Sequence, residues 1–461
     1  MRGRELKIAY IGGGSRAWAR KLMGDLASAD NIYGEVRLYD IDGAAARDNE
    51  IIGNRTAELG KDGKRWNYRA VDDINNALIG CDAVIISVMP GTLDEMASDV
   101  DVPFSYGIYQ PVGDTVGAGG YMRAMRCVPV FRYFAAAIRE NCPSAWVINY
   151  TNPMTLCTRT LYEEFPEIKA FGCCHEVFGT QELLKAALKD ICGIDAGPRE
   201  NIKVDVSGIN HFTWIAKASY RDIDLLEIFS DFTDKYYERG YCVNGKPDEC
   251  LTNVFECGNR IKFELFKRYG VLPAAGDRHL AEFMPQSWFL ESPDIALNKW
   301  KFALTPVEWR RRDLTNRLKE TKDILCGLKK IEARESGEEG VRQLKALSGL
   351  GGFITNVNIP NIGQIKNYPT GAIVETNAMI GYNEVRPLTA SPLPDEVNSL
   401  ILRHVYNQEA FVKAAFEKNI EKVFAAYIND PQVSSLSFDK AREMFEIMIK
   451  NTEKYLKGYW F

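Results

Sequence analysis

The sequence predicts an α/β protein, with a dinucleotide-binding sheet in its N-terminal part and a mixed α+β part behind it. Three observations predict this. A short apolar run at residues 8–11 breaks into consecutive glycines, and helical spacing of apolar side chains follows at residues 18–26. Continuous apolar runs at residues 83–88 and 145–150 are typical of strands buried on both faces of a parallel sheet. Beyond Gly193 the rhythm changes to alternation, which is typical of half-buried strands.

The first strand, turn and helix carry a Rossmann-like pattern of the kind found in lactate and malate dehydrogenases. Gly12, Gly14 and Ala17 fit G-x-G-x-x-A, in which the glycines permit a tight turn and a close approach of a pyrophosphate to the backbone. A second strand at residues 36–39 ends at Asp40, roughly 25 residues past the last glycine, where a carboxylate would bind the adenosine ribose. This favours NAD over NADP, because a carboxylate repels a 2′-phosphate. The predicted cofactor-binding residues are Gly12, Gly13, Gly14, Ser15 and Asp40.

Polar side chains lie at the C-terminal ends of the predicted strands at 145–150 and 168–172. Asn149 and Asn152 lie at the end of the run 145–150, and a strand at 168–172 leads to Cys174 and His175. Open α/β sheets bind ligands at the carboxyl ends of their strands. We therefore expect these side chains to face one crevice. The glycine-rich segment 113–120 is expected to be a loop, either beside the cofactor or at the surface.

A metal site is one interpretation of Cys174 and His211. The chain has only four histidines, and two of them fall between residues 171 and 214. A thiolate and an imidazole suit manganese, iron, cobalt, nickel or zinc. The alternative is that Cys174 is a buried small residue and His211 a hydrogen-bonded core histidine.

The rest of the chain predicts a second domain. We place the boundary at residues 195 and 196, so that residues 1–195 form the nucleotide domain and 196–461 the α+β domain. Residues 202–218 are expected to form one long strand. Helices are expected at about 306–347 and 396–422, with extended segments at 352–357 and 372–380. The charge-rich stretch 308–335 is interpreted as a solvated helix face.

Composition narrows the class of protein. A hydrophobic content of 46% and a net charge of −5 describe an ordinary globular protein, without the basic excess that nucleic-acid binding needs. Eleven cysteines without framework spacing favour free thiols in a reducing compartment. No stretch reaches the roughly 20 apolar residues that span a bilayer, and the charged N-terminus does not look like a signal peptide. We therefore expect a cytoplasmic protein with neither nucleic-acid nor membrane partners.

Five motifs, in this order, resemble one enzyme family. They are IGGGS at 11–15, NYTNPM at 149–154, GCCH at 172–175, GINH at 208–211 and VNIPN at 357–361. Together they resemble the family 4 glycoside hydrolases, the NAD- and metal-dependent glycosidases, over essentially the whole chain. CHEV at 174–177 and GDRHLAEF at 276–283 look most like the bacterial alpha-galacturonidase subgroup.

The resemblance implies a redox route to hydrolysis with NAD and Mn²⁺ or another divalent metal. NAD⁺ takes hydride from C3 of the sugar, a base removes the C2 proton and the glycosidic oxygen leaves by elimination. Water then adds and the hydride returns, while the metal acts as a Lewis acid on the C2 and C3 oxygens. The partner is a small sugar, a galacturonide or galacturonate oligomer, and relatives form homodimers and homotetramers.

The resemblance also implies roles for individual residues. Cys174 and His211 match the metal ligands, Asn152 (with Asn149) the residues that hold sugar hydroxyls, and His175 the position of an acidic proton donor in some relatives. Relatives that act on 6-phosphosugars carry an arginine in the loop after the 83–88 strand, whereas this chain has the acidic segment GTLDEM at 91–96. A phosphosugar is therefore not expected.

The segment at residues 277–279 supplies the remaining candidates. Asp277 replaces the tyrosine that phosphosugar enzymes use as C2 base, and Arg278 and His279 could bind a uronate carboxylate through charge-assisted hydrogen bonds. Three alternatives stay open. They are an alpha-glucosidase or alpha-galactosidase of the same family, a plain NAD-dependent dehydrogenase, and a non-catalytic NAD-binding sensor.

Overall fold

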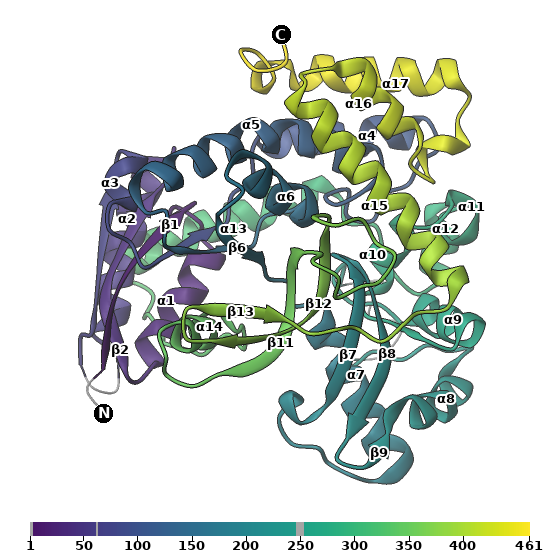
Figure 1. The fold of residues 1–461 in the computed structure, drawn as a ribbon, viewed down its shortest axis with the longest axis horizontal. Helices are drawn as coiled ribbons and strands as arrows, with labels where there is room; N and C mark the ends of the chain where they lie inside the picture. The colour runs from purple at the N-terminus through teal and green to yellow at the C-terminus, as the bar shows by residue number, and fades with distance from the viewer. Residues whose placement is uncertain (1–2, 61–62, 246–252) are drawn as a thin grey trace.

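A nine-stranded sheet forms the centre of the protein, seen in a computed structural model that describes residues 3–60, 63–245 and 253–461 (Figure 1). The strand order is β13-β12-β11-β6-β5-β4-β1-β2-β3. The bounds are β1 Arg4–Ile11, β2 Ile32–Tyr39, β3 Trp66–Val71, β4 Ala83–Ile86, β5 Trp146–Asn149, β6 Lys169–Gly172, β11 Phe353–Pro360, β12 Ile373–Gly381 and β13 Glu384–Pro387.

The strands from β6 to β3 are all parallel and give the doubly wound order 3-2-1-4-5-6, which confirms the predicted fold class. Both faces are buried, because alternate β1 side chains enter different cores: Ile8 and Tyr10 on one face, Ala9 and Ile11 on the other. The helices of this half are α1 Trp18–Ser28, α2 Gly43–Ala57, α3 Ile74–Leu78, α4 Leu93–Ser105, α5 Gly117–Asn141, α6 Met154–Glu164 and α7 Glu176–Cys192.

Strands from the C-terminal half extend this sheet. β11 pairs antiparallel with β6 through Asn358 and Gly172, and β12 and β13 follow antiparallel. Strands on both sides of the predicted boundary at residues 195 and 196 therefore belong to the same sheet. A smaller sheet has the order β10-β8-β7, with β9 on β8. Its bounds are β7 Lys203–Ile209, β8 Phe212–Tyr220, β9 Ile223–Asp224 and β10 Leu272–Pro273.

Residues 202–218 were expected to form one strand, and this was wrong. They form the β7–β8 hairpin, which turns at Asn210 and His211, and His211 has a φ of 70°. Asn210 and His211 are 0% and 3% exposed, so the apolar pattern runs through the turn without a solvent-facing break. In the sequence the turn is therefore marked only by the polar pair Asn210 and His211.

The glycine-rich segment is a loop at residues 113–116, as predicted, but α5 begins at Gly117 and the glycines of its first turn are buried. A Cβ on Gly119 would lie 2.6 Å from the carbonyl oxygen of Asp99 in α4, so only glycine permits this contact. The two long predicted helices are each divided. They form α13 Val307–Leu325 with α14 Gly340–Leu347, and α15 Asp395–Phe416 with α16 Ile420–Ile428.

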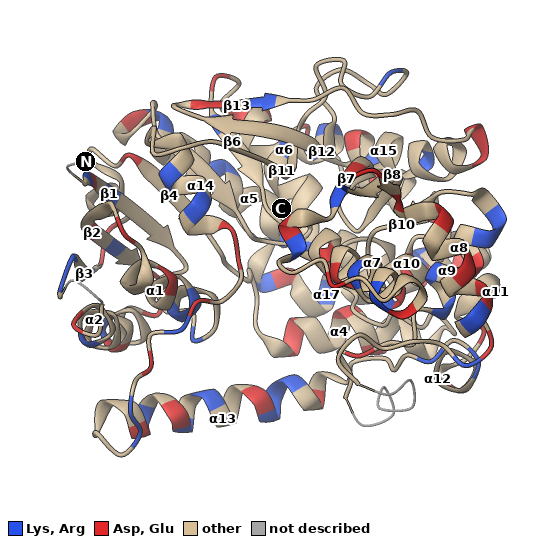
Figure 2. Cartoon of the chain, turned by 90° about the horizontal axis from the view of Figure 1, so that it is seen from below, with Lys and Arg blue, Asp and Glu red and all other residues tan. Residues whose placement is uncertain are grey.

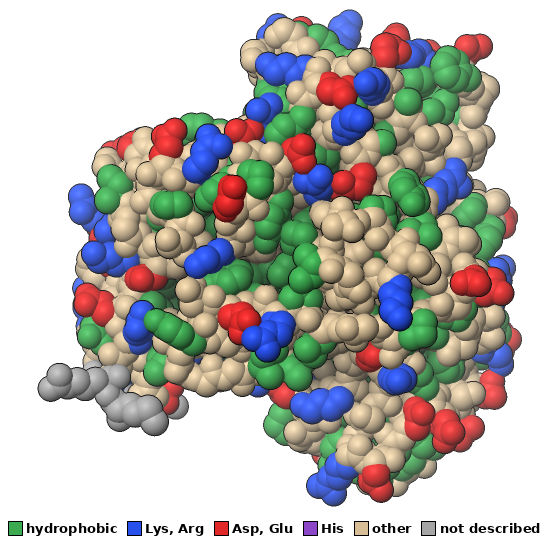
Figure 3. Space-filling model, viewed as in Figure 1, with side chains coloured by type: hydrophobic (Ala, Val, Ile, Leu, Met, Phe, Trp, Pro, Cys, Tyr) green, Lys and Arg blue, Asp and Glu red, His purple; other side chains and the backbone are tan. Residues whose placement is uncertain are grey.

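The remaining α-helices belong to the C-terminal half. They are α8 Leu225–Tyr236, α9 Arg260–Tyr269, α10 Asp277–Glu282, α11 Gln286–Phe289, α12 Pro293–Asn298 and α17 Phe438–Thr452. Charged side chains of both signs are interspersed on the face seen in Figure 3. Among the described residues, no helix is both long and apolar enough to cross a bilayer. Described cysteines other than Cys242 are free thiols, and Cys250 lies outside the described residues.

Helices α15, α16 and α17 pack on α5 in the upper part of Figure 1. Their buried apolar residues form one cluster with those of α5. Trp460 closes this cluster. Its side chain is 6% exposed, and its indole nitrogen donates to the carbonyl oxygen of Met125 at 3.0 Å. Phe461 is 61% exposed.

We expect Trp460→Ala to lower the free energy of unfolding by about 3–5 kcal/mol, because it leaves a cavity against α5 and an unpaired carbonyl group. Denaturant unfolding measures this. Phe461→Ala is the matched control and should change stability by less than about 0.5 kcal/mol. Equal effects of the two substitutions would contradict the buried position of Trp460.

Candidate active site

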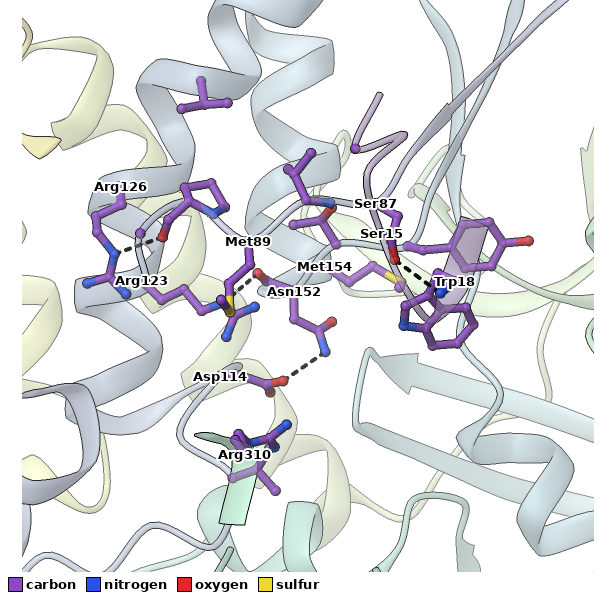
Figure 4. Close-up of a pocket in the computed structure, with 18 of the residues that line it drawn as sticks. Ser15, Trp18, Ser87, Met89, Asp114, Arg123, Arg126, Asn152, Met154 and Arg310 are labelled. Carbon is purple, nitrogen blue, oxygen red and sulfur yellow. Dashed lines mark hydrogen bonds between the residues drawn. The ribbon is translucent and has the colours of Figure 1, made fainter. Parts of the chain in front are cut away.

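A cavity of about 1320 Å³ opens at the carboxyl ends of β1, β2, β4, β5 and β6. Its lining runs from the glycine turn after β1, past the ends of the other strands, to α10 and α13. Figure 4 shows Ser15, Asn152 and Arg310, from three of these segments, around the same space. The crevice expected from the strand ends is therefore present.

One end of the cavity has the features of a dinucleotide site. Gly12, Gly14, Ser15 and Asp40 line it. Gly12 has a φ of +95°, and a Cβ there would lie 2.0 Å from the carbonyl oxygen of Ser87. Only glycine can therefore bring this turn against the strand end. The Ser15 hydroxyl accepts a hydrogen bond from the Trp18 N–H at 3.1 Å, at the start of α1.

Asp40 fixes the turn from β2. Its carboxylate accepts the Gly14 N–H at 2.8 Å and the Asp42 N–H at 2.9 Å. A carboxylate has about four acceptor positions, so it can still accept ribose hydroxyls. Gly13 differs from the other predicted residues because it faces away from the cavity. Its N–H donates to Tyr39, and a Cβ there would lie 2.6 Å from that of Leu38.

The other end holds a cluster with metal-binding donors. Single ligand atoms of Asp114, His211 and His279 lie within 4.8 Å of one another, and the two imidazole rings are 3.8 Å apart. Burial would raise the pKa of Asp114, but the Arg123 guanidinium holds it well below its usual range. Burial lowers the pKa of His211 to about 3. An anionic carboxylate and a neutral imidazole are the forms that bind metals.

Thr115 sets the tautomer of His211. Its hydroxyl donates its single proton to Asp114 at 2.7 Å, so it accepts from Nδ1–H of His211, also at 2.7 Å. This leaves the Nε2 lone pair of His211 available as a ligand. Asp114 was missed from the sequence because it lies in the glycine-rich segment, and His279 was expected to bind substrate.

Cys174 lines the same cavity but lies outside this cluster. Burial raises the pKa of its thiol well above the usual value, and the carboxylates of Glu375 and Glu176 add to the effect. The Asn356 amide donates to the Cys174 carbonyl oxygen at 3.2 Å. Its role as a metal ligand stays a prediction.

The predicted sugar-binding asparagines differ in position. The Asn152 amide donates to Asp114 at 3.2 Å, and its own oxygen is buried without a partner among the described residues (Figure 4). Asn149 does not line the cavity. It is 0% exposed, and its side chain bonds Thr151 and Thr158. The expectation that it contacts substrate is therefore corrected to a role in holding the loop that carries Asn152.

His175 lies at the mouth of the cavity, where its ring stacks on Trp18 with centroids 5.7 Å apart. Its side chain is 47% exposed, and Nδ1 is 3.5 Å from a carboxylate oxygen of Glu338. The position is compatible with the predicted role as an acid.

Asp277 and Arg278 begin α10. The two Asp277 oxygens accept the N–H groups of Ile261 and Lys262 at 3.1 and 3.0 Å. Burial raises the pKa of Asp277 to about 6, although Lys262 acts in the opposite direction. Arg278 donates to the carbonyl oxygen of Pro111 at 3.1 Å and to the Thr305 hydroxyl.

Helix α13 also contributes to the cavity, through Arg310 and Leu314. These residues lie four apart and so share one helix face. The charged stretch was expected to be only a solvated helix face. The charged residues around Arg310 and Leu314 make these two residues inconspicuous in the sequence. Spacing four apart in a charged helix was the only signal that could have identified them.

Glu282 holds the loop that leads to Asp114. One of its oxygens accepts the N–H groups of Val112 and Gly113 at 2.6 and 2.8 Å, and the other is buried without a partner among the described residues. Burial raises the pKa of Glu282 to about 8. The side chain is therefore protonated at neutral pH.

Comparison with known proteins gives matches over almost the whole chain. Residues 7–190 match the family model described as Family 4 glycosyl hydrolase, and residues 206–433 match the Family 4 glycosyl hydrolase C-terminal domain. An alpha-galacturonidase from Thermoanaerobacterium saccharolyticum is 55% identical over 455 residues, covering 99% of this chain and 97% of that protein. An alpha-galactosidase from Bacillus subtilis is 28% identical, covering 93% and 94%.

Two solved structures resemble this one. The crystal structure of Bacillus subtilis lplD, described as a glucosidase, has a TM-score of 0.91 and 48% identity, covering 97% of this chain and 100% of that chain. A 6-phospho-alpha-glucosidase from gut microorganisms, in complex with NAD and Mn²⁺, has a TM-score of 0.77 and 18% identity, covering 99% of each chain. The second likeness is one of fold.

The raised pKa of Glu282 predicts how the stability of the fold depends on pH. Its pKa rises from 4.5 in the unfolded chain to about 8 in the fold, so the folded state keeps a proton that the unfolded state releases. This group therefore contributes stability below about pH 4.5 that is lost as pH rises towards 8, at about 1.4 kcal/mol per pH unit. Glu282→Gln should lack this slope, so its melting temperature should exceed that of the wild type near pH 8 and match it near pH 5. Parallel melting curves across this range would contradict a protonated Glu282.

Proposed function

The chain belongs to family 4 of the glycosyl hydrolases, and from this premise we propose that it is an alpha-galacturonidase, which releases galacturonic acid from alpha-galacturonides. The observation that supports this most is that one cavity joins the glycine turn to the cluster of Asp114, His211 and His279. A redox route to hydrolysis needs a nicotinamide and a metal at the same sugar. The high identity to an alpha-galacturonidase over nearly the full chain supports the substrate.

The residues present fit both cofactors. Gly12, Gly14, Ser15 and Asp40 would hold NAD, since a Cβ on Gly14 would lie 2.9 Å from the Asp40 carboxylate and close the turn. Asp114, His211 and His279 offer metal ligands, with Cys174 as a further candidate in the same cavity. When bound, NAD supplies reversible hydride acceptance at C3 of the sugar, and Mn²⁺ or another divalent metal supplies Lewis acidity.

The protein side chains position the sugar and move its protons. Asn152 offers a buried amide oxygen to a sugar hydroxyl, because that oxygen has no partner among the described residues. Asp277 is the proposed base for the C2 proton. A carboxylate with a pKa of about 6 accepts protons near neutral pH far better than an ordinary carboxylate does. His175, exposed at the mouth, is the proposed acid for the leaving group.

The alternatives have less support. A plain dehydrogenase needs no cluster of two histidines and a carboxylate at the sugar end of its cavity, and a sensor needs no buried base. A neutral alpha-galactoside or alpha-glucoside would use the same redox route, so only substrate preference separates these enzymes. We further propose a cytoplasmic enzyme, in keeping with its free thiols. The homodimer or homotetramer expected from the resemblance stays a prediction.

We expect hydrolysis of an aryl alpha-galacturonide to require both NAD⁺ and Mn²⁺, without accumulation of NADH, because the hydride is returned in each cycle. Aryl release and absorbance at 340 nm, recorded together, measure this. A chelator should abolish activity, and added Mn²⁺ should restore it. NADH formed in step with product would instead identify a dehydrogenase.

Asp277→Asn should lose activity by about 100-fold or more, because an amide cannot accept the C2 proton. Exchange of the C2 hydrogen for deuterium in D₂O, followed by NMR, isolates this step from the rest of the reaction. Glu282→Gln, which also alters a buried carboxyl group next to this site, is the control and should retain exchange. Wild-type exchange in Asp277→Asn would assign the base to another residue.

A further inference from the structure

The proposed substrate differs from a neutral galactoside only at C6, where a carboxylate replaces a hydroxymethyl group. Selection for the uronate is therefore favoured by a cationic side chain at the sugar end of the cavity that has donors free to bind the carboxylate. The following inference rests on the proposed function. It concerns the residue that binds the C6 carboxylate of the sugar.

Most arginines that line the cavity already have protein partners. Arg126 binds Asp99 through two hydrogen bonds in the interior, and Arg16 lies near Asp42 at the dinucleotide end. Arg278, the residue expected from the sequence, bonds Pro111 and Thr305. Arg123 uses its Nε to bond the Asn152 carbonyl oxygen at 3.0 Å. Each of these four arginines therefore has at least one protein partner.

Arg310 is different. Within the described ranges it forms no hydrogen bond or ion pair with the protein, whereas Arg278 has two acceptors for its Nη2 group. The Nε of Arg310, like that of Arg278, is buried without a partner in these ranges. Arg310 nevertheless lines the cavity, with Asp114 between it and Asn152 (Figure 4). A desolvated N–H group without an acceptor costs free energy. A ligand carboxylate would supply two oxygens in the planar arrangement that a guanidinium binds best.

Helix α13 holds Arg310 in this position. It crosses from the α12 side of the molecule to α2, as the lowest helix in Figure 2. Arg20 of α1 donates to the Thr321 hydroxyl at 2.7 Å, and Arg55 of α2 donates to the Ile324 carbonyl oxygen at 3.1 Å. The helix is therefore fixed to the nucleotide-binding half, and the guanidinium is presented from a supported element.

We propose that Arg310 is the specificity-determining residue of this enzyme and that its guanidinium binds the C6 carboxylate of the galacturonyl unit. Arg278 then acts as a positioning residue that ties the loop before Asp114 to the segment before α13. The C6 carboxylate is thus assigned to Arg310 of α13 and not to Arg278 of α10.

The test compares an aryl alpha-galacturonide with the aryl alpha-galactoside of the same leaving group, in saturating NAD⁺ and Mn²⁺. Arg310→Gln should lower kcat/KM for the galacturonide roughly 10- to 100-fold, the range of a lost hydrogen bond to a charged group. The galactoside should change by less than about threefold. Arg310→Lys should fall between the two, because an ammonium keeps the charge without the planar fork.

Two control variants separate this role from folding. Arg311→Gln removes a neighbouring arginine that binds Asp94 at 2.7 Å on the outer side, and it should leave both substrates unchanged. Arg278→Lys should lower both substrates by a similar factor. Melting temperature and NAD⁺ affinity of each variant report on folding. Competitive inhibition by free galacturonate against galactose gives a binding readout independent of turnover, and Arg310→Gln should weaken only the former.

The outcomes distinguish the inference from the function on which it rests. A wild type that hydrolyses no galacturonide would overturn both. A wild type that prefers galacturonides, with equal losses on both substrates in Arg310→Gln, would overturn the inference and leave the function standing. A selective loss in Arg278→Lys with Arg310→Gln unaffected would return the carboxylate contact to α10.

Discussion

The junction of β6 with β11 is the contact on which the rest of the structure depends. Gly172 ends β6 and pairs with Asn358, and a Cβ there would lie 2.7 Å from Met154 and 3.0 Å from the Asn358 side chain. The absence of a side chain lets the two halves of the chain form one sheet. Two residues later the chain reaches Cys174, so the same junction positions this side of the cavity. Behind it, Glu375 bonds Asn356 at 2.7 Å and also bonds Thr213 of β8, which connects both sheets at this point.

The acidic groups of the site differ in pKa because their environments differ. Asp114 lies beside Arg123 and is ionised, whereas Glu282 is buried against backbone N–H groups and is protonated at neutral pH. Asp277 falls between these limits, since Lys262 and two N–H groups partly offset its burial. Carboxyl groups on neighbouring segments can therefore act as ligand, structural acceptor and base. Such separation of pKa values by local environment is how one fold supports acid and base chemistry together.

The sequence predicted those parts of the site whose chemistry is local. The glycine turn, Asp40 and the residues at the strand ends follow from short-range spacing, and the structure brings most of them to one cavity. The β7–β8 turn was missed because only two polar residues, Asn210 and His211, mark it in the sequence, and both are buried in the fold. Asp114 and Arg310 were missed because each depends on contacts between segments far apart in the chain. Asn149 was predicted from its position at a strand end, but the direction of a side chain there is set by the pleat, which places it in the interior.

The order in which the chain is made gives the β6–β11 junction another consequence. During synthesis the parallel strands β1 to β6 leave the ribosome long before β11, which comes from the C-terminal half. Until then β6 is an edge strand with unpaired backbone groups, which is a template for aggregation. A nascent nucleotide-binding half without β11 would therefore expose the edge of its sheet at Gly172. A fragment that stops at the end of α7 would carry this exposed edge permanently.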